Sequence, residues 1–207
     1  MDYGPCHTPG LGVFKNIEEV KPGHFLIFNK TGIHTQKYWK LQTKEHTDSF
    51  GKTCTTIREL LEDSISKQLV SDVPICTMLS GGLDSSIITA YASKYYKDNN
   101  MTKLDTFSVD YVDNDKNFIK SDFQPNSDNY YIDLIKDKFK TNHHQIIIDT
   151  PELSEALEEA MIARDMPGMA DVDSSLLLFC KEISKNAKVA VSRRMCRRNF
   201  CRISMVF

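Results

Sequence analysis

The segment Thr77–Ala90, which reads TMLSGGLDSSIITA, limits the possible folds of this chain more than any other. An apolar run enters a Ser-Gly-Gly turn, and a second apolar run follows an aspartate and two serines. The first run predicts a buried strand and the second predicts a helix. Glycines permit a tight turn and a close approach to a ligand because they have no Cβ atom. We therefore expect a strand that feeds directly into a helix.

Strand-like and helix-like segments alternate on both sides of this turn. Apolar residues recur at helical spacing from Thr53 to Val70, which predicts an amphipathic helix. Further strands are predicted over residues 73–79, 104–109, 145–148 and 188–191, and further helices over residues 85–96, 129–139, 151–164 and 174–183. Strands that are separated by helices form a parallel sheet with helices on its faces. The predicted fold class is therefore α/β.

The stretch before this region has a more extended character. Apolar residues from His24 to Phe28 and a β-prone run that ends at Trp39 flank the turn sequence NKTG, which predicts a short β-hairpin. The net charge is −2, so the chain lacks the basic field that nucleic acid requires. The six cysteines include no C-x-x-C pair, the N-terminus has no signal-peptide core, and no window reaches the roughly 20 apolar residues of a membrane span. We expect a cytoplasmic protein with reduced thiols that binds neither nucleic acid nor membrane.

The turn SGGLDSS has the features of an anion-binding site. The first N–H groups of a helix lack partners within the helix, and the helix dipole adds partial positive charge. The hydroxyls of Ser80, Ser85 and Ser86 can donate into the same space. The turn differs from the common phosphate loop G-x-x-x-x-G-K-S/T, since no lysine follows the glycines. Asp84 could cap the helix, or it could hold a magnesium ion that touches phosphate oxygens.

This turn resembles the pyrophosphate loop (PP-loop) of the ATP pyrophosphatases, which cleave ATP between its α and β phosphates. The resemblance extends to the blocks FSVDY, FQPNSDNYYI, HHQIIID and ARDMPGMADVDSSLLLFCKEI, which are similar in kind and order to the synthetase domain of glutamine-hydrolysing asparagine synthetases. It covers the chain from Gly4 to Ser192. It implies a Rossmann-like parallel sheet of the adenine nucleotide alpha-hydrolase type, preceded by the short β-hairpin.

The resemblance also implies a division of the chain. The upstream block HTPGLGVFKNIEEVKPGHFLIF resembles the junction where the glutaminase domain of that family ends. Residues 1–50 would then be the end of the glutaminase domain and a linker. Residues 51–192 would be the N-terminal part of the ATP-binding domain, and residues 193–207 would be an aberrant tail.

Roles for single residues follow from the same resemblance. Leu79 and Val109 would frame the adenine base, and Asp84 would help to place Mg²⁺. The residues implied in pyrophosphate binding are Ser80, Gly81, Gly82, Ser85 and Ser86. The residues implied near the aspartate substrate are Asp165, Asp171, Asp173 and Ser174.

The implied reaction is ATP-dependent synthesis of asparagine from aspartate through a β-aspartyl adenylate, with ammonia derived from glutamine. The expected ligands are ATP, Mg²⁺, aspartate and ammonia, and a homo-oligomer or a complex with an intact synthetase subunit stays open. A related amidotransferase, such as a β-lactam synthetase, is the alternative within the same group of enzymes.

The tail RRMCRRNFCRISMVF departs from the family pattern. After the strand KVAVS the family continues with a carboxylate motif similar to G-E-C-A-D-E-I-F-G-G-Y-P-W-F. Codons for Arg193–Phe207 can be chosen so that a reading frame shifted by one base spells G-E-C-A-D-E-I-F-A-G-Y-P-W-F. Met195 followed by Cys196 forces the shifted cysteine, and Met205 followed by Val206 forces the shifted tryptophan. We interpret the tail as this motif read out of frame.

The altered tail changes what we expect of the chain as it stands. Without the motif's carboxylates we expect no asparagine synthesis, so a non-catalytic ATP-binding fragment is the rival reading from another class. A nucleic-acid binder with a basic tail is a third reading.

Two other segments carry polar residues. His143 and His144 are zinc-ligand types without a third ligand at metal spacing, so we expect a strand start beside the nucleotide. We expect the acidic stretch DYVDNDKNF to be a solvated loop.

Overall fold

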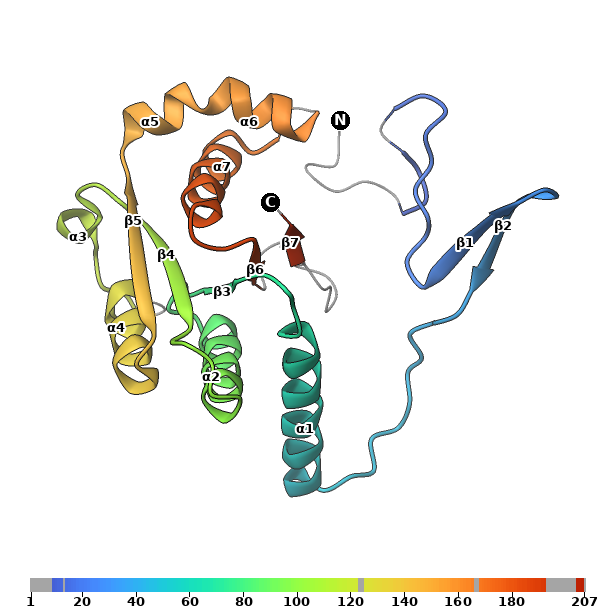
Figure 1. Ribbon diagram of the computed structural model, residues 1–207, viewed down its shortest axis with the longest axis horizontal. Helices are drawn as coiled ribbons and strands as arrows, with labels where there is room; N and C mark the ends of the chain where they lie inside the picture. Colours follow the sequence, from blue (N-terminus) through green and yellow to red (C-terminus); the bar gives the residue numbers. More distant parts are fainter. Residues whose placement is uncertain (1–8, 13, 123–124, 166–167, 193–203, 207) are drawn as a thin grey trace. The chain divides into compact units, whose positions relative to one another are not determined.

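The computed structural model describes residues 9–12, 14–122, 125–165, 168–192 and 204–206. The chain divides into two compact units, with the boundary between Ser49 and Phe50 (Figure 1). Each unit is described by itself below. The tail residues 193–203 and 207 lie outside the described residues, as do residues 1–8.

The first unit contains the predicted hairpin. Strands β1 (His24–Asn29) and β2 (Gly32–Lys37) pair antiparallel, and Asn29 faces Gly32 at the turn. The Asn29 side chain accepts a hydrogen bond from the backbone N–H of Thr31 at 2.9 Å, and Gly32 has a φ of +113°. Asparagine at the first position and glycine at the fourth position are typical of a four-residue β-turn.

The second unit is built on a parallel sheet, which confirms the predicted α/β fold. Its strands are β3 (Ile75–Met78), β4 (Asp105–Tyr111), β5 (Asn142–Ile148), β6 (Val189–Val191) and β7 (Ser204–Val206). They lie in the order β5-β4-β3-β6-β7, and only β7 runs antiparallel to its neighbour. The chain moves outward from β3 to β5 and then returns to the other side of β3. Ligands of open α/β sheets bind at such a reversal, beyond the carboxyl ends of the strands.

Helices cover both faces of this sheet (Figure 1). They are α1 (Phe50–Gln68), α2 (Leu83–Asp98), α3 (Asn114–Asn117), α4 (Asp128–Phe139), α5 (Thr150–Glu155), α6 (Leu157–Arg164) and α7 (Ala170–Ser184). Ile75 packs into one core with residues of α1 and α2, whereas its neighbour Cys76 packs into a second core with residues of α7. Successive side chains of a strand point to opposite faces, so β3 supplies both cores.

One predicted helix is divided in the structure. We expected a continuous helix from Pro151 to Arg164, but α5 ends before Ala156 and α6 begins after it. Ala156 is buried, and its ψ of −6° departs from the helical value of about −42°. Both α5 and α6 contact α7, so the bend lets two short helices pack on a third. This packing was not visible in the sequence.

Candidate functional site

The glycine turn lies between the end of β3 and the start of α2. The N–H of Leu79 donates to the carbonyl of Phe107 at 2.8 Å, which continues the pairing of β3 with β4 past the last strand residue. Leu79 is buried, and the chain then leaves the sheet at Ser80. Gly82 occupies the N-cap position in extended conformation, so α2 begins at Leu83.

Gly81 cannot be replaced by another residue without strain. Its φ is +75°, a region that L-residues with a side chain rarely adopt. A Cβ atom at this position would lie 2.6 Å from the backbone oxygen of Asp128, the first residue of α4. The turn therefore lies too close to the N-terminus of a second helix, α4, to leave room for a Cβ atom.

The serine hydroxyls form hydrogen bonds within the turn. Ser85 Oγ donates to the carbonyl of Gly82 at 3.0 Å and accepts from the N–H of Ser80 at 3.2 Å. Ser80 Oγ lies 3.1 Å from Ser85 Oγ. Ser86 Oγ also donates to Gly82, at 2.8 Å. The structure thus brings together the five residues that the sequence assigned to pyrophosphate.

Asp84 lies in the first turn of α2 and is exposed. Because Gly82 is the N-cap residue, Asp84 does not occupy the capping position that was one of its two predicted roles. Within the described part of the chain, no group of three or more histidine, cysteine or carboxylate side chains could hold a metal ion by itself. Mg²⁺ is usually bound by one or two carboxylates together with phosphate oxygens and water, so a single aspartate would fit that ion if the turn binds phosphate.

The two residues predicted to frame adenine lie at the carboxyl ends of neighbouring strands. Val109 is half-buried in β4, two positions after Phe107, which pairs with Leu79. Leu79 and Val109 therefore border the same edge of the sheet as the glycine turn. The carboxyl end of β6 reaches this edge as well, since Val191 faces Thr77 of β3.

A polar cluster at the end of β4 was missed in the sequence. Asp110 accepts hydrogen bonds from the side chains of Asn114 at 2.7 Å and of Asn129 at 2.6 Å. The prediction of a solvated loop for DYVDNDKNF was wrong here, because Asp110 and Tyr111 belong to β4 and residues 114–117 form α3. The block FSVDY marked this strand end, but no sequence signal identified the partners from other elements.

The four residues predicted near the substrate lie at the end of α6 and in the first part of α7. Asp173 pairs with Arg164, whose Nη1 lies 2.7 Å from both carboxylate oxygens. Asp165 ends α6 in left-handed conformation with a φ of +59°, and Ser174 Oγ donates to the carbonyl of Ala170 at 2.8 Å. The side chain of Asp171 lies outside the described residues.

One hydrogen bond links this region to the sheet edge. The hydroxyl of Tyr111, at the end of β4, lies 2.8 Å from Ser175 Oγ on α7. Ser175 is buried. The first part of α7 is therefore held near the strand end that follows Val109.

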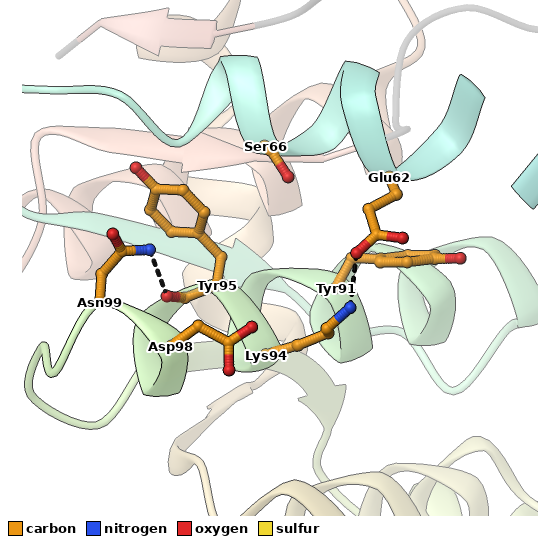
Figure 2. A pocket seen from close by; sticks show the side chains of 7 residues that line it. All are labelled: Glu62, Ser66, Tyr91, Lys94, Tyr95, Asp98 and Asn99. Atoms are coloured by element: carbon orange, nitrogen blue, oxygen red, sulfur yellow. Dashed lines mark hydrogen bonds and ion pairs between the residues drawn. The ribbon is translucent and has the colours of Figure 1, made fainter. Parts of the chain in front are cut away.

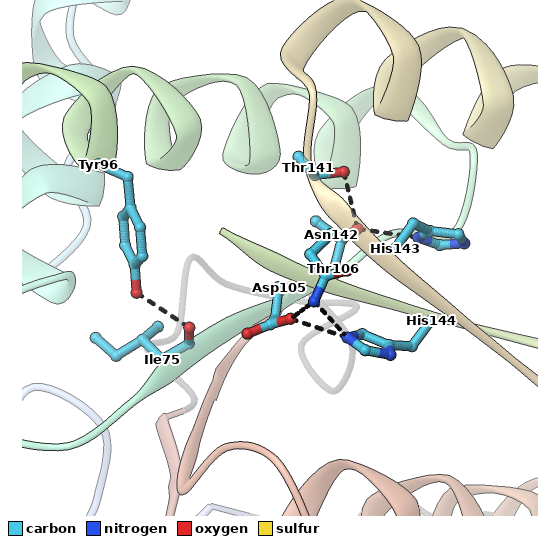
Figure 3. Close-up of polar contacts among 8 residues, drawn as sticks. All are labelled: Ile75, Tyr96, Asp105, Thr106, Thr141, Asn142, His143 and His144. Atoms are coloured by element: carbon cyan, nitrogen blue, oxygen red, sulfur yellow. Dashed lines mark hydrogen bonds and ion pairs between the residues drawn. The ribbon is translucent and has the colours of Figure 1, made fainter. Parts of the chain in front are cut away.

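The paired histidines lie at the amino end of β5, away from the strand ends that carry the turn (Figure 3). His143 is hydrogen bonded to Thr106 Oγ1 at 2.9 Å and to Ser108 Oγ at 3.1 Å, and burial lowers its pKa. His144 bonds to Asp105 at 2.8 Å and stacks on Phe107. The pair lies at the start of a strand as expected, and its hydrogen bonds join β5 to β4 at the edge of the sheet opposite to the glycine turn.

A small pocket of about 70 Å³ lies between α1 and the C-terminal half of α2 (Figure 2). Lys94 and Glu62 form an ion pair of 2.5 Å across it. Because the pocket lies toward the end of α2 opposite to the glycine turn, it is not part of the candidate site. None of the helices in the described ranges is long and apolar enough to cross a membrane.

The chain is similar in sequence to a known protein family. Residues 56–192 match the family model described as asparagine synthase. The chain is 49% identical over 189 residues to asparagine synthetase [glutamine-hydrolyzing] 3 of Bacillus subtilis. This match covers 91% of this chain and 31% of that protein. It is 29% identical over 157 residues to a putative asparagine synthetase [glutamine-hydrolyzing] 2 of Methanocaldococcus jannaschii, covering 75% of this chain and 28% of that protein.

A plant relative extends the comparison. The asparagine synthetase [glutamine-hydrolyzing] of Zea mays is 27% identical over 163 residues, or 76% of this chain and 26% of that protein. The chain thus spans about a third of its bacterial relative, and the matched segment contains β3, the glycine turn, α2 and β4. The chain belongs to the asparagine synthase family.

Proposed function

We propose that this chain carries the ATP-binding site of a glutamine-hydrolysing asparagine synthetase. The observation that carries the proposal is the glycine turn, which opens a helix at the point where the strand order of the sheet reverses. In this site Leu79 and Val109 border the adenine base. The pyrophosphate part of ATP lies against the turn and the first N–H groups of α2, where the helix dipole favours negative charge.

The proposed reaction is activation of a carboxylate followed by transfer to ammonia. An oxygen of the aspartate β-carboxylate attacks the α-phosphorus of ATP, and the bond from that phosphorus to the bridging oxygen breaks, so that pyrophosphate leaves. Ammonia derived from glutamine then attacks the acyl carbon of the β-aspartyl adenylate, and AMP leaves with the bonding electrons. The turn stabilises the charge that develops on pyrophosphate, a contribution that is usually large in catalysis.

Mg²⁺ would be held by Asp84 together with phosphate oxygens and water, and it would supply charge neutralisation on the pyrophosphate. The aspartate would lie near the first part of α7, which Tyr111 and Ser175 hold close to the end of β4. Asp173 is committed to Arg164, so it orients that guanidinium rather than meeting the substrate directly.

We further propose that the chain with its present residues 193–207 binds ATP without completing the reaction. The support is the sequence after Ser192, which lacks the family's carboxylate motif at the strand end that lies beside the turn. Fewer carboxylates near the phosphates mean weaker placement of Mg²⁺ and weaker stabilisation of the leaving group.

The first test is binding of MgATP to the full chain, measured by titration calorimetry. MgATP and inorganic pyrophosphate should compete for one site, and AMP should bind more weakly because it lacks the β and γ phosphates. Ser86→Ala should weaken MgATP binding at least about tenfold, since a hydrogen bond to a charged group contributes roughly 1.5–3 kcal/mol. Ser184→Ala is the matched control, because Ser184 Oγ also donates to a carbonyl of its own helix but lies far along α7.

The second test is aspartate-dependent exchange between pyrophosphate and ATP. Binding of MgATP without exchange supports both parts of the proposal. Exchange by this chain would overturn the second part and leave the ATP site intact. No competition between MgATP and pyrophosphate, at any concentration that the folded chain tolerates, would overturn the first part.

A further inference from the structure

The carboxylate of Asp110 accepts four hydrogen bonds from donors of the protein. Oδ1 accepts from the backbone N–H of Tyr111 at 2.8 Å and from Asn114 Nδ2 at 2.7 Å. Oδ2 accepts from Asn129 Nδ2 at 2.6 Å and, more weakly, from Gln145 Nε2 at 3.4 Å. A carboxylate has about four acceptor positions. Asp110 therefore has a role in holding other residues, although it directly follows the predicted adenine-framing residue.

Asn129 is the partner that is fixed most completely. Its amide nitrogen donates to Asp110, and its amide oxygen accepts from Gln145 Nε2 at 3.0 Å. Because both ends of the amide are engaged, its orientation is determined. Asn129 lies in the first turn of α4 and is half-buried. The end of β4, the side chain of a β5 residue and the start of α4 are thus joined in one network.

The network reaches the glycine turn through the residue before Asn129. Asp128 is the first residue of α4, and its backbone oxygen lies 2.6 Å from the position that a Cβ of residue 81 would occupy. Gly81 itself has a φ of +75°. The backbone of α4 therefore forms a wall against the turn, and any interaction that holds Asn129 also holds this wall.

We propose that Asp110 is a positioning residue of the glycine turn. By binding Asn129 it keeps the first residue of α4 against Gly81, and so it holds the turn in the conformation that receives the phosphates of ATP. The phosphate part of this statement rests on the proposed function, whereas the conformation of the turn does not. The competing explanation is that the cluster only ties β4 to β5 and stabilises the sheet.

Exchanging the two side chains tests the specific hydrogen bond. In Asp110→Asn an amide meets the donor of Asn129, and in Asn129→Asp two carboxylates face each other. The double variant Asp110→Asn/Asn129→Asp reverses donor and acceptor. Residue 110 can still accept from Tyr111 and Asn114, its new amide can donate to residue 129, and Gln145 can donate to the new carboxylate.

The chain offers a matched control on the same strand. Asp105, at the amino end of β4, also accepts from two side chains of β5, Asn142 Nδ2 at 2.5 Å and His144 Nε2 at 2.8 Å (Figure 3). Asp105→Asn weakens the pairing of the same two strands at the end away from the turn. A role in sheet stability alone predicts that both aspartates behave alike.

The measurement is amide hydrogen exchange of peptides that cover residues 80–86 in the full chain, with MgATP affinity measured in parallel. We expect Asp110→Asn and Asn129→Asp each to speed exchange in the turn about tenfold and to weaken MgATP binding about tenfold, which is the effect of losing one hydrogen bond to a charged group. The double variant should return both quantities to within about threefold of the unaltered chain. Asp105→Asn should change neither quantity, although it lowers the melting temperature.

The outcomes separate this inference from the proposed function. If exchange in the turn is unchanged in Asp110→Asn, or if Asp105→Asn has the same effect, the positioning role is wrong. If the unaltered chain does not bind MgATP, the proposed function fails, but the exchange data still decide whether Asp110 holds the turn. If Asp110→Asn does not fold, Gln145→Ala removes only the two longer bonds of the network. It should then show a smaller increase of exchange in residues 80–86, and an unchanged rate there would also overturn the role.

Discussion

Two residues of the second unit show how a single side chain, or its absence, sets what the fold can do. Gly81 supplies a backbone conformation that brings β3, α2 and the start of α4 together. Cys76, in the middle of β3, is fully buried between the sheet and α7. Gly81 is required because it has no Cβ atom, whereas Cys76 packs as a small apolar side chain.

Gly81→Ala should destabilise the chain and abolish MgATP binding. The left-handed conformation costs an alanine roughly 1–2 kcal/mol, and the overlap with the oxygen of Asp128 adds to this cost because backbone must move. Urea denaturation at equilibrium measures the loss of stability. The control is Gly51→Ala in α1, where a new Cβ meets no described atom outside its own helix within 4 Å. Equal stability of the two variants would contradict the strain assigned to Gly81.

Cys76 should make the stability of the chain fall at alkaline pH. Burial, together with the smaller effect of the nearby Asp105 carboxylate, raises the pKa of the Cys76 thiol from 9.0 to about 12. Between these values the unfolded chain loses a proton that the folded chain retains, so unfolding becomes more favourable as the pH rises. Above pH 9 the free energy of unfolding should fall more steeply than in Cys76→Ala, by about 1.4 kcal/mol per pH unit. If the free energy of unfolding falls equally with pH in the unaltered chain and in Cys76→Ala, the thiol also ionises in the folded state and the prediction is wrong.

At the scale of elements, the sequence predicted which segments form strands and helices but not how they meet. Alternation of apolar runs and helical periods was sufficient for β3, α2, β4, α4, β5, α7 and β6, since each of these has a strong local pattern. The bend at Ala156 depends on packing against α7, which has no local signal. The same is true of Asp110, whose partners Asn129 and Gln145 come from later elements.

The glycine turn could be located from sequence because glycines, hydroxyls and the change of period are all local features. Its outer wall could not, since Asp128 is distant in the chain and contributes only backbone. The pairing of Asp173 with Arg164 was also missed, because it joins two different helices, α6 and α7. Local chemistry was thus predictable, and contacts between elements were not.

Helix α1 allows a test of the packing between elements. Its apolar residues recur at helical spacing, but Ile65 is buried against α2 and β3 whereas Leu60 is 63% exposed. Ile65→Ala should lower the free energy of unfolding by about 2–5 kcal/mol, because it removes buried methyl groups and leaves a cavity. Leu60→Ala, the control on the same helix, should change it by no more than about 0.5 kcal/mol. A large effect at Leu60 would mean that this part of α1 is covered when the chain is in solution.

At the scale of the whole molecule, the arrangement of the sheet gives the sequence after Ser192 its importance. β6 lies next to β3, and its carboxyl end reaches the edge that carries the glycine turn. In the proposed ATP site, residues that follow this strand end would therefore lie close to the phosphates. In this chain the only described residues after Ser192 are those of β7, which adds an antiparallel strand to an otherwise parallel sheet.

The DNA that encodes Arg193–Phe207 should contain the family's carboxylate motif in a frame shifted by one base. Sequencing across the codon for Ser192, from independent copies of the gene, measures this directly. Met195–Cys196 and Met205–Val206 fix a cysteine and a tryptophan in the shifted frame whatever codons are used, so the interpretation depends on the glycine, glutamate and aspartate codons between them. If those codons do not spell the motif, the arginines of the tail need an explanation of their own. If they do, the turn, Asp84 and the wall of α4 are the parts of a synthetase site that survived the change of frame, and restoring the frame should restore aspartate-dependent exchange between pyrophosphate and ATP.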